Sequence, residues 1–264
     1  MRQDFPVEPF NNSRVLSGWA NNLKIRYGTF AWGRVEWVGR LYPKGVREAK
    51  FLSHYVEHFN SIELQATQHK TYSAAEVEKW TIQAEGKDFL FCPKVPQAVS
   101  HFSSFIDVED KTKAYLDSFY AFGGHLGPVL LQVSDRFSPK RKEAVLSYLE
   151  TLPKDLQFFL EVRNREWFEE NTYTELLESL RRLKVGLIIS DNEIRPLLFD
   201  LTVPKCWIRY TSSGEFSRLD RWFEKLNEWG AKGLQEAYFF FQDCEDKVQL
   251  LDELLYFKNL VDNG

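Results

Sequence analysis

The sequence predicts an α/β protein that forms a single (β/α)8 (TIM) barrel, and three observations support this prediction. The chain has 264 residues, close to the roughly 250 that are typical of this barrel. Short apolar runs alternate with amphipathic helical patterns along the chain, which indicates a parallel sheet with helical crossovers. Eight strands are expected in alternation with eight helices, a number that favours a closed barrel. The polar, Asn-rich residues 1–23 are expected to form an N-terminal arm over the surface, which leaves 24–264 as the TIM-barrel domain.

The expected strands are apolar runs that end in polar residues. They lie at 23–32, 61–65, 88–95, 126–134, within 157–168, and at 185–190, 205–211 and 235–243. The fifth, in QFFLEVRNREWF, is nearly continuously apolar before its charges, as expected for a strand that is covered on both faces. Pro93 lies near the end of the third strand, where a missing ladder hydrogen bond matters least.

The expected helices show apolar residues at helical spacing. They lie at about 47–59, 73–85, 110–122, 138–151, 171–184, 217–230 and 246–261. Ser73, followed three residues later by Glu76, has the spacing of a capping box. Ser138-Pro139 places a proline in the first turn of the next helix. Residues 192–204, with two prolines, form an irregular insert between the sixth and seventh strands.

Composition excludes several classes of protein. The formal net charge of -4 argues against a general nucleic-acid or anionic-membrane binder, so neither partner is expected. Cys92, Cys206 and Cys244 form no zinc or CxxC motif, which predicts buried thiols in a reducing compartment. The N-terminus has no apolar signal region and no stretch approaches 18 apolar residues, so we expect a cytoplasmic protein. No nucleotide fingerprint follows any strand, and no cofactor is expected.

Polar residues gather where the expected strands end, which is the face on which TIM barrels place their active sites. They are Glu63, Gln65, Lys94, Gln132, Glu161, Arg163, Asp191, Arg209, Gln242 and Asp243. Glu161 and Arg163 have the same parity and therefore point to the same side of the sheet. These side chains are expected to converge on one mouth of the barrel, in greater number than a packed interior needs.

The residue types at this mouth suggest specific roles. Glu63, Glu161 and Asp191 are the candidate catalytic acids and bases. The candidate substrate-binding residues are Lys94, His101, Gln132, Arg163, Trp167, Arg209 and Gln242. Among them, Lys and Arg suit a phosphate or carboxylate, and His101 is a second candidate for proton transfer. Trp167, with Trp32, Trp37 and Tyr42, is a candidate to roof the pocket and stack on a sugar or base.

The same residues also allow other interpretations, in which they are structural or bind a metal. The charged residues could form an ion-pair network that is only architectural, although buried ions are costly. His54 and His58 are four residues apart on one helix, but no third metal ligand is evident nearby. The three candidate carboxylates suit Mg²⁺ or Mn²⁺ only if the fold brings them together, and no metal is expected.

Several of these stretches, in this order and spacing, resemble the YecE-like family, also called domain of unknown function 72, a group of TIM-barrel proteins. The matching stretches are IRYGTFAW, FNSIELQATQHKTY, FLFCPKV, LGPVLLQVSDRF, LEVRNREWF, IISDN and CWIRY, within about residues 25–245. The chain departs from the family pattern at Gln65, at 210–212 after Arg209, and at the Phe241-Gln242-Asp243 end of the last strand. The resemblance implies the barrel fold and carries no biochemical function.

The leading hypothesis for function is an enzyme that acts on a small anionic metabolite, such as a phosphorylated sugar or related carbohydrate. Carboxylates would transfer protons while Arg and Lys bind the anion. One alternative is a non-catalytic barrel that binds a ligand or nucleic acid, and another is a metal-dependent hydrolase or isomerase. Fold alone does not choose among them, because this barrel hosts many unrelated chemistries.

Overall fold

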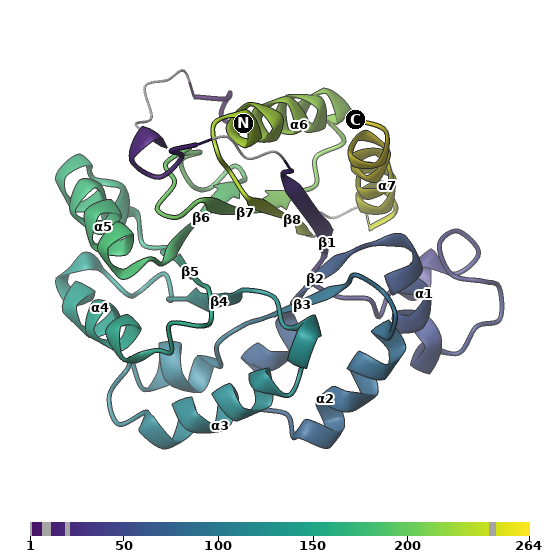
Figure 1. Cartoon of the computed structure of the whole chain (residues 1–264), viewed down its shortest axis with the longest axis horizontal. Coiled ribbons are helices and arrows are strands. Elements are labelled where there is room, and N and C mark those ends of the chain that lie inside the picture. Colours follow the sequence, from purple (N-terminus) through teal and green to yellow (C-terminus); the bar gives the residue numbers. More distant parts are fainter. Residues whose placement is uncertain (1, 7–11, 19–21, 243–246) are drawn as a thin grey trace.

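The chain folds as one α/β domain in which helices surround a curled parallel sheet (Figure 1). The structure is a computed structural model that describes residues 2–6, 12–18, 22–242 and 247–264. Its strands are β1 (Lys24–Thr29), β2 (Ser61–Leu64), β3 (Leu90–Pro93), β4 (Val129–Gln132), β5 (Phe158–Glu161), β6 (Gly186–Asp191), β7 (Lys205–Thr211) and β8 (Glu236–Gln242). The eight predicted strands are therefore confirmed.

The strands form two hydrogen-bonded groups. Six of them pair in the parallel order β1-β8-β7-β6-β5-β4, and β2 pairs with β3. Bridges at Lys94–Leu130 and Phe91–Leu126 link the end of the β2–β3 pair to β4. The strands lie along an arc, with β2 and β3 between β1 and β4 (Figure 1). β1 contacts β2, and β3 contacts β4.

Side chains and a glycine replace the missing ladder between β1 and β2. The backbone N–H of Tyr27 donates to Asn60 Oδ1 at 2.7 Å, and Asn60 Nδ2 donates to the carbonyl of Ile25 at 2.9 Å. A Cβ on Gly28 would lie 2.0 Å from the carbonyl oxygen of Ser61. The two strands therefore approach closely because position 28 has no side chain.

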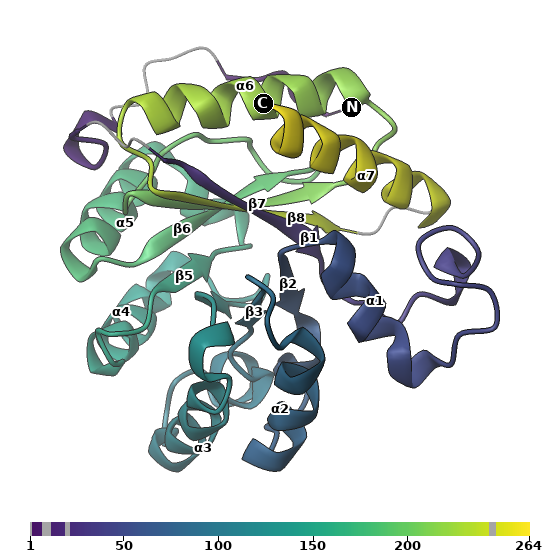
Figure 2. The same cartoon turned by 45° about the vertical axis from the view of Figure 1, so that its right-hand side comes forward.

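The helices lie outside the strands, and α6 and α7 lie side by side over the β8–β1 region (Figures 1 and 2). Their bounds are α1 (Phe51–His58), α2 (Ala74–Thr81), α3 (Glu109–Tyr120), α4 (Lys142–Thr151), α5 (Glu170–Leu183), α6 (Phe216–Ala231) and α7 (Lys247–Asn263). The predicted capping box is confirmed, because Ser73 accepts from the Glu76 N–H and Glu76 accepts from the Ser73 N–H. The expectation of eight helices is wrong, since these seven are the α-helices of the described residues. The proline-containing segment 192–204 between β6 and β7 has no helix.

Two apolar regions bury the two faces of the strands. Apolar side chains, half of them aromatic, fill the inside of the arc: Cys92, Leu130, Phe159, Ile188, Val203, Trp207, Tyr238 and Phe240. Larger clusters lie between the strands and the helices. Cys92 and Cys206 are buried free thiols, as predicted, whereas Cys244 and Asp243 lie outside the described residues.

The described part of the N-terminal arm packs against the domain. Phe5 lies edge-on to Phe199 and Trp222, with ring centroids 5.3 Å and 5.0 Å away. Asn12 is buried, and its side chain bonds the backbone at Phe199 and Leu201. These residues therefore contribute to the core beside α6. Residues 1, 7–11 and 19–21 of the predicted arm lie outside the described residues.

Candidate functional site

A layer of polar side chains caps the aromatic interior at the carboxyl ends of the strands. Strand parity explains their direction, because Glu161 follows the inward Phe159, Arg209 follows Trp207, and Gln242 follows Phe240. We call the following residues the mouth cluster: Glu63, Lys94, Gln132, Glu161, Arg195, Arg209 and Gln242. Six of them were predicted from the sequence, and hydrogen bonds join all seven.

Arg209 on β7 is the centre of this cluster. Its Nε and Nη2 donate to the two carboxylate oxygens of Glu63 at 3.1 and 3.0 Å. Its Nη1 donates to Glu161 Oε2 at 2.6 Å, and Nη2 also donates to Gln242 Oε1 at 2.8 Å. One guanidinium thus joins β2, β5, β7 and β8 with a planar fork that a lysine would not provide.

A second chain of contacts runs from Lys94 to Glu161. Lys94 Nζ donates to Gln132 Oε1 at 2.9 Å, and Gln132 Nε2 donates to Glu161 Oε2. The register of the sheet places Gln132 beside Glu161 as the last pair of β4 and β5. The Thr67 hydroxyl donates to the Lys94 carbonyl at 2.9 Å and accepts from its N–H at 2.8 Å, which fixes the backbone that presents this amine.

Arg195 is the member of the cluster that sequence analysis missed. It lies on the irregular segment 192–204, and its Nη1 donates to Glu161 Oε1 at 3.1 Å. Its backbone N–H donates to Asn192 Oδ1 at 2.9 Å, so a local turn sets its direction. The available signal was an arginine shortly after the sixth strand, but no periodic pattern indicates where a loop side chain points.

Positive charge exceeds negative charge in the cluster, with Lys94, Arg195 and Arg209 against Glu63 and Glu161. Burial alone raises the pKa of Glu161, but the charges of Arg209, Arg195 and Lys94 outweigh it and hold that pKa below its ordinary value. Burial, followed by the charge of Arg209, lowers the pKa of Lys94 from 10.5 to about 8. The Glu161 carboxylate is therefore ionised at neutral pH, and the Lys94 amine loses its proton at a pH only slightly above neutral.

The cluster also holds donors that its own residues do not use. Gln242 Nε2 and Arg195 Nε are buried and make no hydrogen bond within the described residues. Buried polar atoms are nearly always paired, so unused donors of this kind favour a ligand that brings acceptor oxygens.

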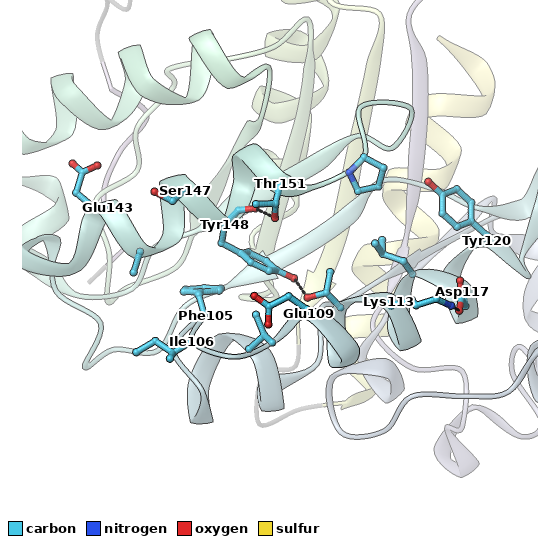
Figure 3. A pocket seen from close by; sticks show the side chains of 15 residues that line it. Phe105, Ile106, Glu109, Lys113, Asp117, Tyr120, Glu143, Ser147, Tyr148 and Thr151 are labelled. Carbon is cyan, nitrogen blue, oxygen red and sulfur yellow. Dashed lines mark hydrogen bonds and ion pairs between the residues drawn. The ribbon is translucent and has the colours of Figure 1, made fainter.

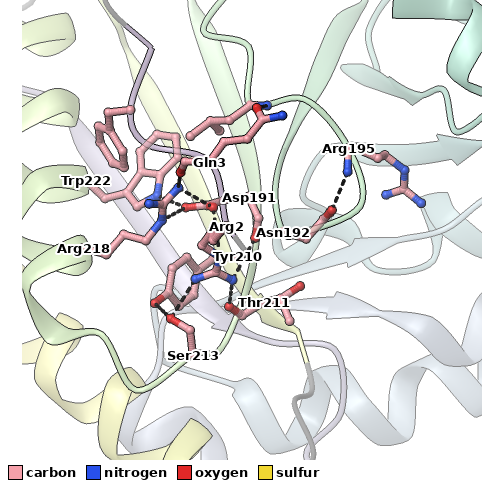
Figure 4. A network of polar contacts seen from close by, with 12 residues as sticks. Arg2, Gln3, Asp191, Asn192, Arg195, Tyr210, Thr211, Ser213, Arg218 and Trp222 are labelled. Carbon is pink, nitrogen blue, oxygen red and sulfur yellow. Dashed lines mark hydrogen bonds and ion pairs between the residues drawn. The ribbon is translucent and has the colours of Figure 1, made fainter.

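Asp191, a predicted catalytic residue, lies outside the mouth cluster. It follows the outward-facing Ile189 on β6, and both its oxygens face α6. Arg218 Nε and Nη2 each donate to it at 2.8 Å, and Trp222 Nε1 donates at 2.6 Å. Arg2 of the arm adds an ion pair at 3.4 Å. Figure 4 shows this group around Asp191 with Arg195 directed away from it. The carboxylate therefore ties α6 and the arm to the sheet.

Three predicted binding residues lie beside the cluster or beneath the surface. Arg163 comes after the end of β5 and pairs with Asp135 at 3.1 Å. His101 is half-buried beside Ser100 Oγ at 2.8 Å, and burial, with the charges of Lys94 and Arg163, lowers the pKa of His101. Trp167 is 1% exposed, and its Nε1 donates to the Phe137 carbonyl at 2.8 Å, so it is a core residue.

The other aromatic candidates for a pocket roof belong to the core or to its margin. Trp37 and Tyr42 are fully buried, with Tyr42 stacked on Phe51 at 4.6 Å. Trp32 lies edge-on to Trp80 at 5.7 Å. Packing of α1 and α2 therefore accounts for these rings.

The donor set fits a metal ion poorly. Among the described residues, no three His, Cys, Asp or Glu side chains cluster in a way that would ligate one. Glu63 and Glu161 share Arg209 between them, and Asp191 is on the opposite face of the sheet. A cation in the cluster would have to displace the guanidinium.

Comparisons with known proteins place the chain in a family. A family model described as "Protein of unknown function DUF72" matches residues 26–263. The chain belongs to the DUF72 family. The chain is 25% identical over 255 residues to the UPF0759 protein YecE of Escherichia coli, with 87% of this chain and 91% of YecE covered. It is 28% identical over 165 residues to the UPF0759 protein YunF of Bacillus subtilis, with 60% and 57% covered.

Solved DUF72 structures share the fold. A DUF72 family protein from Thermotoga maritima has a TM-score of 0.71 at 22% identity, with 91% of this chain and all of that chain covered. One from Enterococcus faecalis also has a TM-score of 0.71, at 17% identity, with 91% and 96% covered. The family resemblance predicted from the strand-end motifs is thereby confirmed, and no activity comes with it. In the described part of this DUF72 chain, no helix is long and apolar enough to cross a membrane.

A large surface hollow of this DUF72 chain lies away from the mouth cluster. It has a volume of about 910 Å³ between α3 and α4, beside the loop that carries Phe105 and Ile106 (Figure 3). Tyr148 lies in it, with its hydroxyl 2.9 Å from Thr112 Oγ1. None of the predicted site residues line this hollow.

Proposed function

We propose that this DUF72 chain is an enzyme that binds a small anionic metabolite, such as a phosphorylated sugar or related carbohydrate, at the mouth cluster. We further infer that the two strand groups form one (β/α)8 barrel whose ring of hydrogen bonds is interrupted between β1 and β2 and reduced to isolated bridges between β3 and β4. In such a barrel the carboxyl ends of the strands form the reactive face. Two buried free thiols support a reducing, cytoplasmic location.

The observation that carries the proposal is the buried excess of positive charge. The layer holds three cations and two carboxylates, and within it Lys94 and Glu161 are at most 2% exposed. In a network that served only the architecture, the positive and negative charges would be expected to be equal in number, because an uncompensated buried charge is costly. A phosphate or carboxylate would restore the balance and accept from Gln242 Nε2 and Arg195 Nε.

Proton transfer in this proposal belongs to Glu161 and Lys94. Glu161 is held ionised, and Lys94 has the amine that titrates near neutral pH, with Gln132 between them. Glu63 lies in the bidentate grip of Arg209 and orients that guanidinium. The Asp191 carboxylate has no part in the chemistry, because it faces α6.

The test is a thermal-unfolding screen with inorganic phosphate and phosphorylated sugars. A ligand at about 100 times its Kd stabilises the fold by about 2.7 kcal/mol, which corresponds to a Tm rise of roughly 5–10 °C for a chain of this size. Arg195→Ala is expected to remove most of this rise. It is a better probe than Arg209→Ala, since Arg195 contacts one oxygen of one carboxylate and leaves the Glu63 pair intact.

The matched control is Arg182→Ala, which removes an exposed ion pair with Glu150 at 3.0 Å and should keep the full rise. The proposal is refuted if phosphate compounds give no rise, or the same rise in Arg195→Ala as in the wild type. Binding without turnover of any bound compound would favour the non-catalytic alternative.

A further inference from the structure

We propose that Lys94 is a nucleophilic amine that forms an imine with the carbonyl carbon of an anionic aldehyde or ketone. The inference rests on the proposed anion site and narrows its substrate to carbonyl compounds that carry a phosphate or carboxylate. Four features of the mouth cluster support it.

The first feature is the contact made by the amine. Lys94 is 2% exposed, yet within the described residues it makes no ion pair within 4.0 Å, and Nζ donates to the neutral amide oxygen of Gln132. Arg209 and Arg195 take the carboxylate oxygens that would otherwise hold the ammonium. An amine that only binds charge would be expected to lie against a carboxylate, whereas a buried lysine next to cations is typical of a nucleophile.

The second feature is the electrostatic setting of Nζ. Arg209 and Arg163 face it as positive charges, Glu63 and Glu161 as negative ones, and the net effect with burial is a pKa of about 8. His101 is near enough to have its own pKa lowered by Lys94. At about pH 7.4 roughly one fifth of the amine is then neutral, against about one in a thousand for an ordinary lysine. Only the neutral amine has the lone pair that attacks a carbonyl.

The third feature is the rigidity of the amine's support. The Thr67 hydroxyl bonds both the N–H and the carbonyl of Lys94, and Gln132 is held by Glu161 on its other side. Nζ is therefore fixed at the end of β3 before a substrate arrives, which lowers the entropic cost of reaching the reacting geometry.

The fourth feature is the place for the anionic group and its route of entry. Gln242 Nε2 and Arg195 Nε supply unused donors within the same hydrogen-bonded cluster as Lys94. Arg195 is 11% exposed and lies on a segment without helix or strand, so it can leave Glu161 without breaking a ladder. A small carbonyl compound would enter there.

The step balances without a redox partner. The Nζ lone pair forms a C–N bond to the carbonyl carbon, and the π electrons move to the oxygen, which takes a proton. The C–O bond then breaks and the nitrogen lone pair forms C=N. The two hydrogens of the neutral amine leave with the carbonyl oxygen as water: one moves to the oxygen during the addition, and the other moves to it as the C–O bond breaks.

The experiment traps the imine in the full-length wild-type protein. Glyoxylate, pyruvate, dihydroxyacetone phosphate and, as a neutral control, acetone are each added with cyanoborohydride, and the modified lysines are located by peptide mass spectrometry. We expect an anionic carbonyl to modify Lys94 about tenfold or more above the exposed Lys113, because far more of its amine is neutral. Inorganic phosphate and Arg195→Ala should each reduce that adduct, and acetone should not favour Lys94.

The outcomes separate this inference from the proposed function. Modification of Lys113 with Lys94 untouched overturns the imine, and a phosphate-induced Tm rise in the same samples would leave the anion site standing. If the yield of the Lys94 adduct changes neither with added phosphate nor in Arg195→Ala, the result supports the nucleophile and overturns the anion site. Neither an adduct nor a Tm rise overturns both.

Discussion

Replacing Arg209 with methionine tests the central claim about the mouth cluster. Methionine keeps an unbranched side chain of moderate length but removes the guanidinium that joins four strands. The change deletes four hydrogen bonds: two to Glu63, one to Glu161 and one to Gln242. Glu161 retains Arg195 and Gln132 as donors, whereas within the described residues Arg209 is the only hydrogen-bond partner of the fully buried Glu63 carboxylate.

The magnitude follows from that stranded carboxylate. Removing one partner of a buried ion pair costs about 3–5 kcal/mol of unfolding free energy, since an uncompensated charge remains. With roughly 2–4 °C per kcal/mol for a large domain, Tm should fall by on the order of 10 °C.

The assay is urea-induced unfolding of the wild type, Arg209→Met, and the double variant Arg209→Met/Glu63→Gln. The double variant should recover part of the loss, because a neutral amide replaces the unpaired charge. Arg182→Met is the surface control, expected to cost no more than about 1 kcal/mol, because its ion pair is 65% and 50% exposed. A loss below about 1 kcal/mol in Arg209→Met, or no recovery in the double variant, would refute the reasoning.

Three further predictions follow from the same contacts. Burial and Arg209 lower the pKa of Lys94 from 10.5 to about 8. Between these two pH values the unfolded chain binds more protons than the folded one, so the free energy of unfolding rises with pH. Lys94→Met should remove about 3 kcal/mol of that rise, measured by urea titrations at about pH 7 and about pH 10.5. Asp191→Asn leaves the buried Arg218 without its carboxylate and should lower the unfolding free energy by about 3–5 kcal/mol, and a change under 1 kcal/mol in the same assay would contradict the assigned role. Gly28→Ala places a Cβ against the β2 backbone and should cost at least about 1–3 kcal/mol by thermal unfolding, whereas Gly124→Ala, with no neighbour within 4 Å, should cost little.

The predicted strands and most of the mouth cluster depended on local patterns. Period-2 alternation gives the direction of a side chain relative to its neighbours, so Glu161 with Phe159 and Arg209 with Trp207 were predictable from the chain. The capping box at Ser73 was predictable for the same reason, because its partner is three residues away.

Strand alternation alone did not predict which face of the sheet Asp191 is on. On β6 the inward residues are Ile188 and Ser190, and Asp191 faces α6 with Ile189. A continuously apolar strand gives no sign of which parity is inward, since both of its faces are covered. Only the position of α6, which supplies Arg218 and Trp222, decides it.

The sequence by itself determined the order of strands and helices, the family, and the polar residues at the strand ends, because these depend on period, spacing and motif. The tertiary structure decided which of those residues meet. Arg209 finds Glu63 across 146 positions of the chain, and Arg195 reaches Glu161 from a loop without periodicity. Contacts of this kind depend on the curl of the sheet and on loop geometry, neither of which any local pattern encodes. The same curl of the sheet left Lys94 with a neutral partner and the cluster with its excess of positive charge.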